Sequence, residues 1–260
     1  MIRWVAFPPL TSDPVGMSLQ EVISILRANT ESLSFSEPVT HVYAPLAYAS
    51  QPVSDYVDRF AASGIEALFL GMNPGPWGMA QTGIPFGEVA HVREFLGITG
   101  EINRPENEHP KRPVTGFECA RSEVSGRRFW EWVQDRFTTP EAFFDRFFVW
   151  NWCPLAFLEA SGRNRTPDKL VAEERRPLEE ACDEALRGVV AALEPRRIIG
   201  IGAYACKRAH IALDDASIPI DSVLHPSPAS PAANRGWAPQ IEAQLESLGV
   251  KIPGRIRSVK

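Results

Sequence analysis

Long hydrophobic runs and clustered cysteines are both missing from this sequence of 260 residues. No stretch reaches the roughly 18 apolar residues that a membrane-spanning helix needs, so we expect no membrane contact. The four cysteines, Cys119, Cys153, Cys182 and Cys206, are widely scattered and include no C-x-x-C pair. This spacing argues against disulfides, zinc sites and iron–sulfur clusters, and we expect free thiols with no metal and no cofactor.

Several enzyme motifs are missing as well. The sequence contains no G-x-x-x-x-G-K-[ST] phosphate loop and no G-x-S-x-G nucleophile elbow. Gly200-Ile201-Gly202 lacks the third glycine of a dinucleotide fingerprint. The net charge of −5 does not indicate a nucleic-acid partner, although only the local field near a groove decides such binding. Composition therefore leaves a nucleic-acid partner open.

What is present suits one α/β domain. With 44% hydrophobic and 10% aromatic residues, the chain can bury a substantial core. We expect a single domain over residues 1–250, a basic tail over 251–260 and a monomeric protein. The first ten residues are too short and too interrupted by proline for a signal peptide. We therefore expect an intracellular protein, located in the cytoplasm or nucleoid of a bacterium or in the nucleus of a eukaryote.

Hydrophobic periodicity predicts alternating strands and helices. Buried strands are expected at residues 67–70, 147–152, 197–202 and 222–224. Helices are expected at 18–27, where Ser18 and Glu21 form a capping box, around 56–60, at 89–96 and 129–137, from Thr166-Pro167 to 193, and at 237–248. A long loop is expected between 101 and 125. This order predicts a mostly parallel central sheet with helices on both faces.

The segment from Gly71 to Gly87 is the most unusual part of the sequence. It follows an apolar run and contains eight glycines and prolines, which cannot continue a strand or begin a helix at once. Its few polar side chains are those of Asn73, Gln81 and Thr82. This composition indicates a rigid loop that forms the wall of a pocket for a small, flat molecule.

Three polar residues follow predicted strands: Asn73, Asn151 and His225. Ligands of parallel sheets bind beyond the carboxyl ends of the strands, so we expect these side chains to meet at one edge. An amide such as that of Asn151 can donate and accept in one plane, which suits a base edge, and Phe86 offers a stacking face. No carboxylate can be placed beside this set from the sequence.

Several long motifs resemble one family. They are residues 71–81 (GMNPGPWGMAQ), 83–89 (GIPFGEV), 111–114 (KRPV), 122–126 (SEVSG), 151–155 (NWCPL) and 225–228 (HPSP) continuing through 233–237 (ANRGW). In this order they resemble the single-strand-selective monofunctional uracil-DNA glycosylases of the uracil-DNA glycosylase superfamily. The resemblance implies that superfamily's α/β fold. It also implies removal of uracil, and of C5-oxidised uracils, from single- and double-stranded DNA by an enzyme without lyase activity.

The resemblance also implies roles for individual residues. Asn73 would position the attacking water and His225 would stabilise the departing uracil anion at O2. Asn151 would read N3 and O4 of the base while Phe86 stacks on it. The substrate pocket would further include Met72, with Gly75 and Met79 near uracil C5.

The resemblance also implies DNA contacts around the HPSP motif at 225–228. The Pro226-Ser227-Pro228-Ala229 segment would be the wedge that supports base flipping, with further contacts from Arg235, Lys111 and Arg112. Family members can carry an arginine at the position of Ala229, so Arg235 or another side chain would have to fill the vacated space. Two alternatives stay open: a superfamily glycosylase specific for hypoxanthine or xanthine, and a non-catalytic nucleic-acid-binding module.

Overall fold

The computed structural model describes residues 16–214 and 216–255. The predictions for the first ten residues, and for positions 256–260 of the basic tail, lie outside these ranges. In the described part of the chain, no helix is long and apolar enough to cross a membrane.

The centre of the fold is a parallel four-stranded sheet in the order β3-β2-β6-β7. Its strands are β2 (Ala67–Gly71), β3 (Phe147–Asn151), β6 (Ile198–Ile201) and β7 (Ile220–Val223). β2 and β3 are buried along their whole length, which explains their continuous apolar sequences. All four predicted strands are therefore confirmed within one or two residues, as is the predicted fold class.

A second sheet was not predicted. It is antiparallel, with the order β1-β4-β5, and consists of β1 (Val39–Tyr43), β4 (Ala156–Glu159) and β5 (Asn164–Arg165). β1 and β4 come from segments more than a hundred residues apart, and β5 is only two residues long, so local sequence carries little signal for this sheet. The hairpin of β4 and β5 follows the end of β3 and thereby brings β5 to the neighbourhood of the site.

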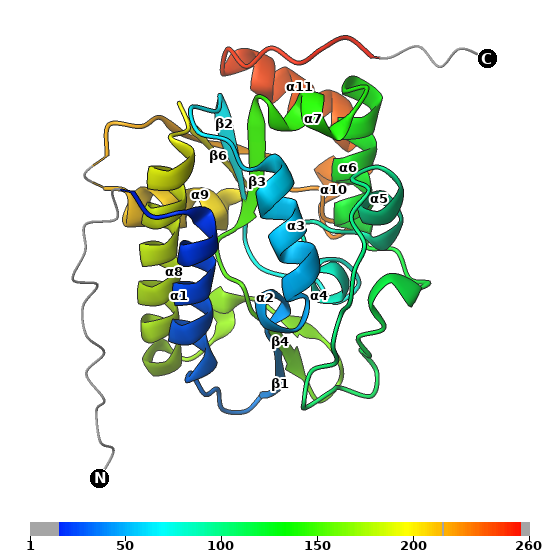
Figure 1. Cartoon of the computed structure of the whole chain (residues 1–260), viewed down its shortest axis with the longest axis vertical. Coiled ribbons are helices and arrows are strands. Elements are labelled where there is room, and N and C mark those ends of the chain that lie inside the picture. Colours follow the sequence, from blue (N-terminus) through cyan, green and yellow to red (C-terminus); the bar gives the residue numbers. More distant parts are fainter. Residues whose placement is uncertain (1–15, 215, 256–260) are drawn as a thin grey trace.

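Helices cover both faces of the central sheet. Figure 1 shows α1 and α8 side by side on one side of it and α6 with α11 on the other. The longer helices are α1 (Leu19–Glu31), α3 (Ser50–Phe60), α6 (Val124–Arg136), α8 (Ala172–Leu193), α9 (Ala203–Ala212) and α11 (Trp237–Ser247). The short ones are α2 (Pro45–Tyr48), α4 (Met79–Thr82), α5 (Val89–Glu94), α7 (Pro140–Phe144), α10 (Pro231–Asn234) and two 3-10 turns, Gly116–Glu118 and Pro167–Lys169.

Most predicted helices are present, and the capping box of Ser18 and Glu21 is formed. The predicted start at Thr166 is wrong. Thr166 instead precedes a single 3-10 turn, its hydroxyl lies 2.5 Å from the Asp168 carboxylate, and α8 begins only at Ala172. The Thr166-Pro167 sequence therefore does start a turn, but this turn ends after three residues and does not continue into α8.

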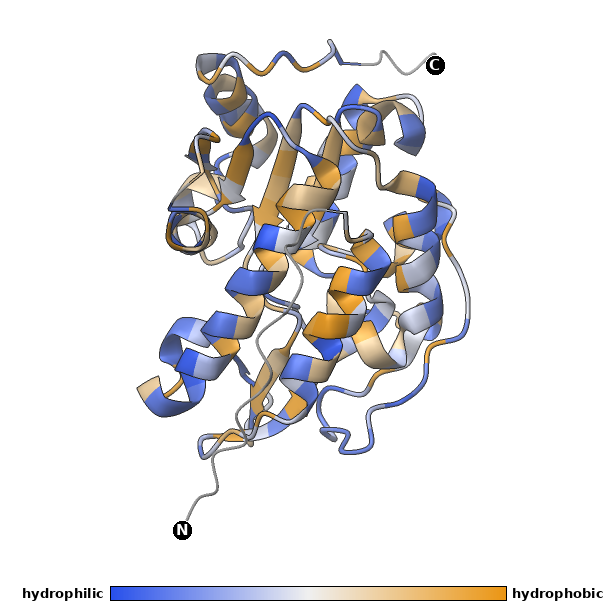
Figure 2. Ribbon diagram, turned by 60° about the vertical axis from the view of Figure 1, so that its left-hand side comes forward, coloured by the Kyte–Doolittle hydropathy of each residue, from blue (hydrophilic) through white to orange (hydrophobic). Residues whose placement is uncertain are grey.

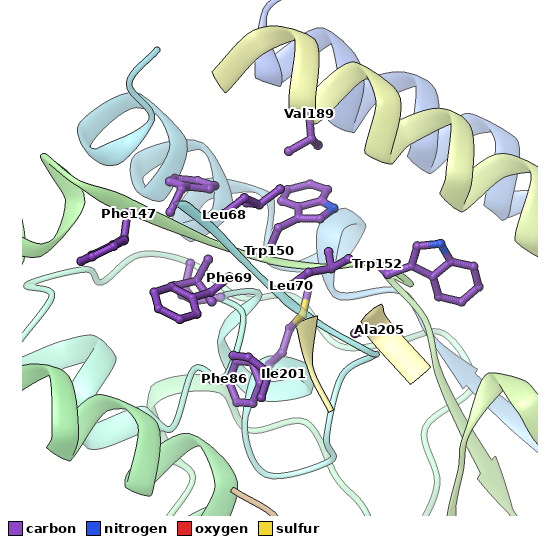
Figure 3. Packing of buried hydrophobic residues seen from close by; sticks show 14 of the residues in the cluster. Leu68, Phe69, Leu70, Phe86, Phe147, Trp150, Trp152, Val189, Ile201 and Ala205 are labelled. Carbon is purple, nitrogen blue, oxygen red and sulfur yellow. The ribbon is translucent and has the colours of Figure 1, made fainter. Parts of the chain in front are cut away.

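The core lies between the sheet and its helices. The hydropathy colouring of Figure 2 shows hydrophobic central strands, whereas the helices alternate hydrophobic and hydrophilic residues. On one face of the sheet Leu68 and Trp150 point toward Val189 of α8 (Figure 3). Phe69 points to the opposite face, on the side where Phe86 lies (Figure 3). Alternation along β2 thus links the α8 layer to the aromatic layer beneath the site.

A buried ionic cluster joins α8, α9 and the end of β3. The Asp183 carboxylate pairs with Arg208 and accepts a 2.7 Å hydrogen bond from Nε1 of Trp152, while Arg208 also contacts Glu179 at 3.1 Å. Because Trp152 follows Asn151 directly, this cluster helps to fix the carboxyl end of β3.

Replacing Asp183 by alanine should destabilise the fold by about 3 kcal/mol, because it leaves Arg208 buried with one carboxylate fewer. Asp135→Ala is the matched control, since Asp135 forms an exposed pair with Arg255 and should cost less than about 1 kcal/mol. Urea unfolding of both variants measures the difference. Equal small losses would show that the buried cluster does not stabilise the fold.

Candidate active site

The carboxyl edge of the parallel sheet opens into a pocket of about 550 Å³. The loop after β2, the end of β3 and the segment after β7 all contribute to its wall. The structure therefore brings together Asn73, Asn151 and His225, as the strand-end argument predicted. The full lining consists of Met72, Asn73, Gly75, Pro76, Trp77, Met79, Phe86, Ser122, Glu123, Val124, Ser125, Asn151, Asn164, Thr166, His225, Ser227 and Pro228.

Phe86 lies at the base of this pocket in an unusual backbone conformation. Its φ of +53° is in the left-handed region, which is rare for a bulky residue and is held by the surrounding structure. One face of its ring stacks on Phe129 of α6 with 5.1 Å between centroids. A Cβ at Gly126 would collide with the Phe86 carbonyl oxygen, so α6 can approach only because this residue is glycine. The result is a fixed aromatic surface at the pocket floor.

Asn151 is held at the end of β3 opposite Gly71 of β2. A side chain at Gly71 would collide with Oδ1 of Asn151 and would come within 2.8 Å of the Phe86 ring. The Asn151 amide nitrogen lies 3.1 Å from the Met79 sulfur, and the residue is only 5% exposed. A buried amide with a donor and an acceptor in one plane can pair with the edge of a planar base.

His225 follows β7, and its ring centroid lies 6.0 Å from that of Phe86. Burial in the pocket lowers the pKa of His225 to about 4, because desolvation disfavours the imidazolium. The ring is therefore neutral at physiological pH and offers one N–H donor. Its Cβ lies 3.3 Å from where a Cβ on Gly202 would stand, so the glycine at the end of β6 leaves room for it.

Asn73 begins the glycine- and proline-rich loop after β2. Its amide nitrogen lies 3.4 Å from the carbonyl oxygens of both Pro74 and Leu155. This orientation turns the nitrogen toward backbone carbonyl groups and leaves Oδ1 as an available acceptor. An amide has no useful basicity, so such a residue can orient a water without removing its proton.

Glu123 is a carboxylate in the pocket wall that sequence reasoning did not place. Its carboxyl group occupies the space where a side chain at Gly75 or Gly78 would stand. Burial raises the pKa of Glu123 to about 7, backbone N–H groups of Trp77 and Gly78 oppose this rise, and repulsion from Glu88 adds to it. The SEVSG motif was a visible signal, but its proximity to Gly75 arises only in the folded chain.

The predicted DNA-contact residues lie in different places. Ser227 and Pro228 line the pocket, Pro226 is buried, and Ala229 and Arg235 are exposed outside the lining. The remaining two, Lys111 and Arg112, also lie outside it.

The arginines near the rim have distinct contacts. The guanidinium groups of Arg112 and Arg121 lie 5.2 Å and 4.6 Å from the Trp77 ring, and Trp77 belongs to the pocket wall. Arg128 instead donates to the carbonyl of Pro226 at 3.0 Å and to Oδ1 of Asn234 at 2.9 Å. Arg128 thus fixes the loop after His225.

Side chains that commonly bind metal ions do not gather into a ligand set within residues 16–214 and 216–255. No group of three or more histidine, cysteine, aspartate or glutamate side chains is arranged there to hold a metal ion. All four cysteines are free thiols. The polar side chains of the pocket wall include amides, hydroxyls, one imidazole and one carboxyl group.

Comparison with known proteins decides the family. The family model of the uracil DNA glycosylase superfamily matches residues 58–248. The chain belongs to the uracil-DNA glycosylase superfamily. Within it, the chain is 48% identical over 244 residues to the single-strand selective monofunctional uracil-DNA glycosylase of Rattus norvegicus, covering 92% of this chain and 88% of the relative. The corresponding protein of Bos taurus is 48% identical over 229 residues, covering 86% and 84%.

Solved structures support the superfamily fold. The crystal structure of wild-type Pedobacter heparinus SMUG2 superposes with a TM-score of 0.60 at 16% identity, covering 88% of this chain and 99% of that one. At this identity the likeness concerns the arrangement of the elements. It agrees with the α/β class predicted from the sequence.

The raised pKa of Glu123 should make stability depend on pH. Between about 4.5 and 7 the folded chain still holds a proton that the unfolded chain has released. Stability should therefore fall as the pH rises through this window, by up to about 3 kcal/mol in total. In Glu123→Gln this contribution should be absent.

Unfolding by urea at several pH values, from 4.5 to 8, measures this contribution as the difference between wild type and variant. Glu131→Gln, which removes an exposed carboxylate from α6, is the control and should follow the wild-type curve. A constant difference between wild type and Glu123→Gln across the range would contradict the raised pKa.

Proposed function

We propose that this protein hydrolyses the N-glycosidic bond of uracil in DNA and leaves an abasic site, without a lyase step. The observation that carries the proposal is the convergence of Asn73, Asn151 and His225 around the Phe86 ring, in a chain 48% identical to curated uracil-DNA glycosylases. Polar C5 substituents are included in the proposed substrate range, because the polar carboxyl group of Glu123 fills the space beside Gly75, the residue expected near C5.

Recognition begins when the nucleotide leaves the base stack, which costs a few kcal/mol for a paired base and less in single strands. The extruded base stacks on the face of Phe86 opposite Phe129. The amide of Asn151 then donates from Nδ2 to O4 and accepts the N3–H at Oδ1. Cytosine presents an amino group and an unprotonated N3 at these positions, so the same amide orientation rejects it.

Bond cleavage places negative charge on the departing base and positive charge on the sugar. The neutral imidazole of His225 donates its N–H to O2 as the charge develops there. Because the group is buried, the hydrogen bond acts in a low dielectric and needs no reorganisation during the reaction. Asn73 orients the water that attacks C1′.

The proposal also covers the end of the reaction and the partner. A lyase step needs an amine that forms a Schiff base with the sugar, and none of the described pocket-lining residues is a lysine. We propose that the protein acts as a monomer on single- and double-stranded DNA, in whichever compartment contains that DNA. The rim arginines Arg112 and Arg121, with Lys111, would contribute the positive charge that attracts the phosphate backbone.

Replacing His225 by leucine should lower the single-turnover rate of uracil release by about 10²–10³-fold, because the anion loses its donor. Asn73→Ala should lower it by about 10–10²-fold through loss of the oriented water. The substrates are end-labelled oligonucleotides with one uracil, single-stranded and duplex, incubated in EDTA and cut with alkali. His210→Leu and Asn103→Ala change exposed residues of the same types and should keep the wild-type rate.

Other outcomes of the same assay would redirect the proposal. Cutting without alkali would indicate a lyase step. Wild-type protein that ignores uracil but releases hypoxanthine or xanthine would have a shifted specificity. Binding of uracil-containing DNA without release of any of these bases would leave a non-catalytic binding module.

A further inference from the structure

Asn164 is a pocket residue to which neither the sequence nor the proposed function assigns a role. It lies on β5, where it pairs with Leu158 of β4, and its side chain belongs to the pocket wall. Its Oδ1 is buried and meets no hydrogen-bond donor in the described part of the chain. Its Nδ2 donates to the carbonyl oxygen of Pro74 at 3.3 Å.

A buried acceptor without a partner is costly. Leaving such a group unsatisfied costs about 1–3 kcal/mol, so native proteins keep few of them and place a water or ligand donor against most. Asn164 lines a pocket of about 550 Å³, which has room for water and contains further polar side chains such as those of Asn73 and Asn151. The unsatisfied oxygen therefore indicates a place where a donor from water or substrate binds during function.

The same carbonyl links Asn164 to Asn73. The amide nitrogen of Asn73 lies 3.4 Å from the Pro74 oxygen, and that of Asn164 lies 3.3 Å from it. Both carboxamides therefore turn their nitrogen atoms toward one shared acceptor. With the nitrogen atoms used in this way, each carboxamide has its oxygen left as an acceptor, and both residues line the same pocket.

Two acceptors suit a water that is not deprotonated before it attacks. A water that donates one proton to each of two amide oxygens keeps a lone pair for the anomeric carbon, and its rotation is restricted. A single acceptor would leave that water free to rotate about one hydrogen bond. The amide of Asn73 is itself no base, and the Glu123 carboxyl group is packed against Gly75 and Gly78, so orientation is the main contribution that the amides can make to the nucleophile.

We propose that Asn164 is a second catalytic residue, which together with Asn73 holds the attacking water. The inference rests on the proposed glycosylase function. In the reaction the C1′–N1 bond breaks and its electron pair leaves with the base, while a water lone pair forms the C1′–O bond. The water loses one proton to solvent, and the uracil anion takes one up on departure, so the products are neutral uracil and the abasic sugar.

The test separates the nucleophile from the leaving group. Single-turnover rates are measured for Asn164→Ala on oligonucleotides carrying uracil or 5-fluorouracil, whose anion is the better leaving group. The variant should be about 10–10²-fold slower on both bases by the same factor. His225→Leu should lose clearly more on uracil than on 5-fluorouracil, because His225 assists the departure of the base.

Binding distinguishes chemistry from structure. The Kd of Asn164→Ala for an oligonucleotide with 2′-fluoroarabino-uracil, which resists cleavage, should stay within about 3-fold of wild type. Asn164→Asp has nearly the same shape and keeps an oxygen acceptor, so its rate should lie above that of Asn164→Ala. Asn103→Ala should match wild type in every assay.

Three results would overturn the inference. They are a wild-type rate in Asn164→Ala, a loss of affinity as large as the loss of rate, and a leaving-group dependence like that of His225→Leu. If both alanine and aspartate variants unfold at lower temperature and lose rate in proportion, Asn164 only supports the fold. Failure of the wild-type protein to release either base would instead contradict the proposed function itself.

Discussion

The site depends on the absence of a side chain at Gly71, the last residue of β2. Neighbouring strands of a parallel sheet lie about 4.8 Å apart, and here the space beside Gly71 is filled by the Asn151 amide and the Phe86 ring. Any larger residue would displace both groups. The Phe86 ring and the Asn151 amide are thus placed relative to each other by the close approach to Gly71. The register of β2 with β3 determines which residue of β3 faces the pocket. The loop that carries Asn73 begins at the same point, so a single strand end organises three parts of the pocket.

Burial gives this pocket its electrostatic character. It shifts the two titratable groups of the wall in opposite pKa directions, since it lowers the pKa of His225 to about 4 and raises that of Glu123 to about 7. Both shifts have the same cause, which is that desolvation disfavours a charged form. The imidazole is consequently an uncharged donor in the resting state. In the proposed reaction, charge that develops on the bound base would meet an oriented dipole in a medium that screens it weakly. This is the condition under which one hydrogen bond contributes most.

Sequence reasoning predicted the sheet edge well and the side walls poorly. The apolar runs of β2 and β3 are uninterrupted and therefore easy to recognise as strands. In a parallel sheet the carboxyl ends of the strands share one edge, so the sequence could predict that Asn73, Asn151 and His225 lie close together. Glu123 and Asn164 could not be placed in this way, because the first begins a helix after a long loop and the second lies in a two-residue strand of an unpredicted sheet. The helix start at Thr166 failed for a related reason. Its local signal was genuine, but tertiary structure decided that only one turn would follow.

The loop after His225, which we propose as the wedge in base flipping, has no large side chain at its Ala229 position. Ala229 at its exposed tip is too small to fill the space of an extruded base, and Arg235 lies outside the pocket lining. The loop itself is held firmly. Arg128 donates to its Pro226 and Asn234 ends, and the Asn234 amide donates to the Pro228 carbonyl at 2.8 Å. Two prolines further restrict its backbone. A rigid loop loses little conformational entropy when it presses into a strand, so in the proposed wedge role backbone stiffness would take over part of the work that a long side chain performs by filling space.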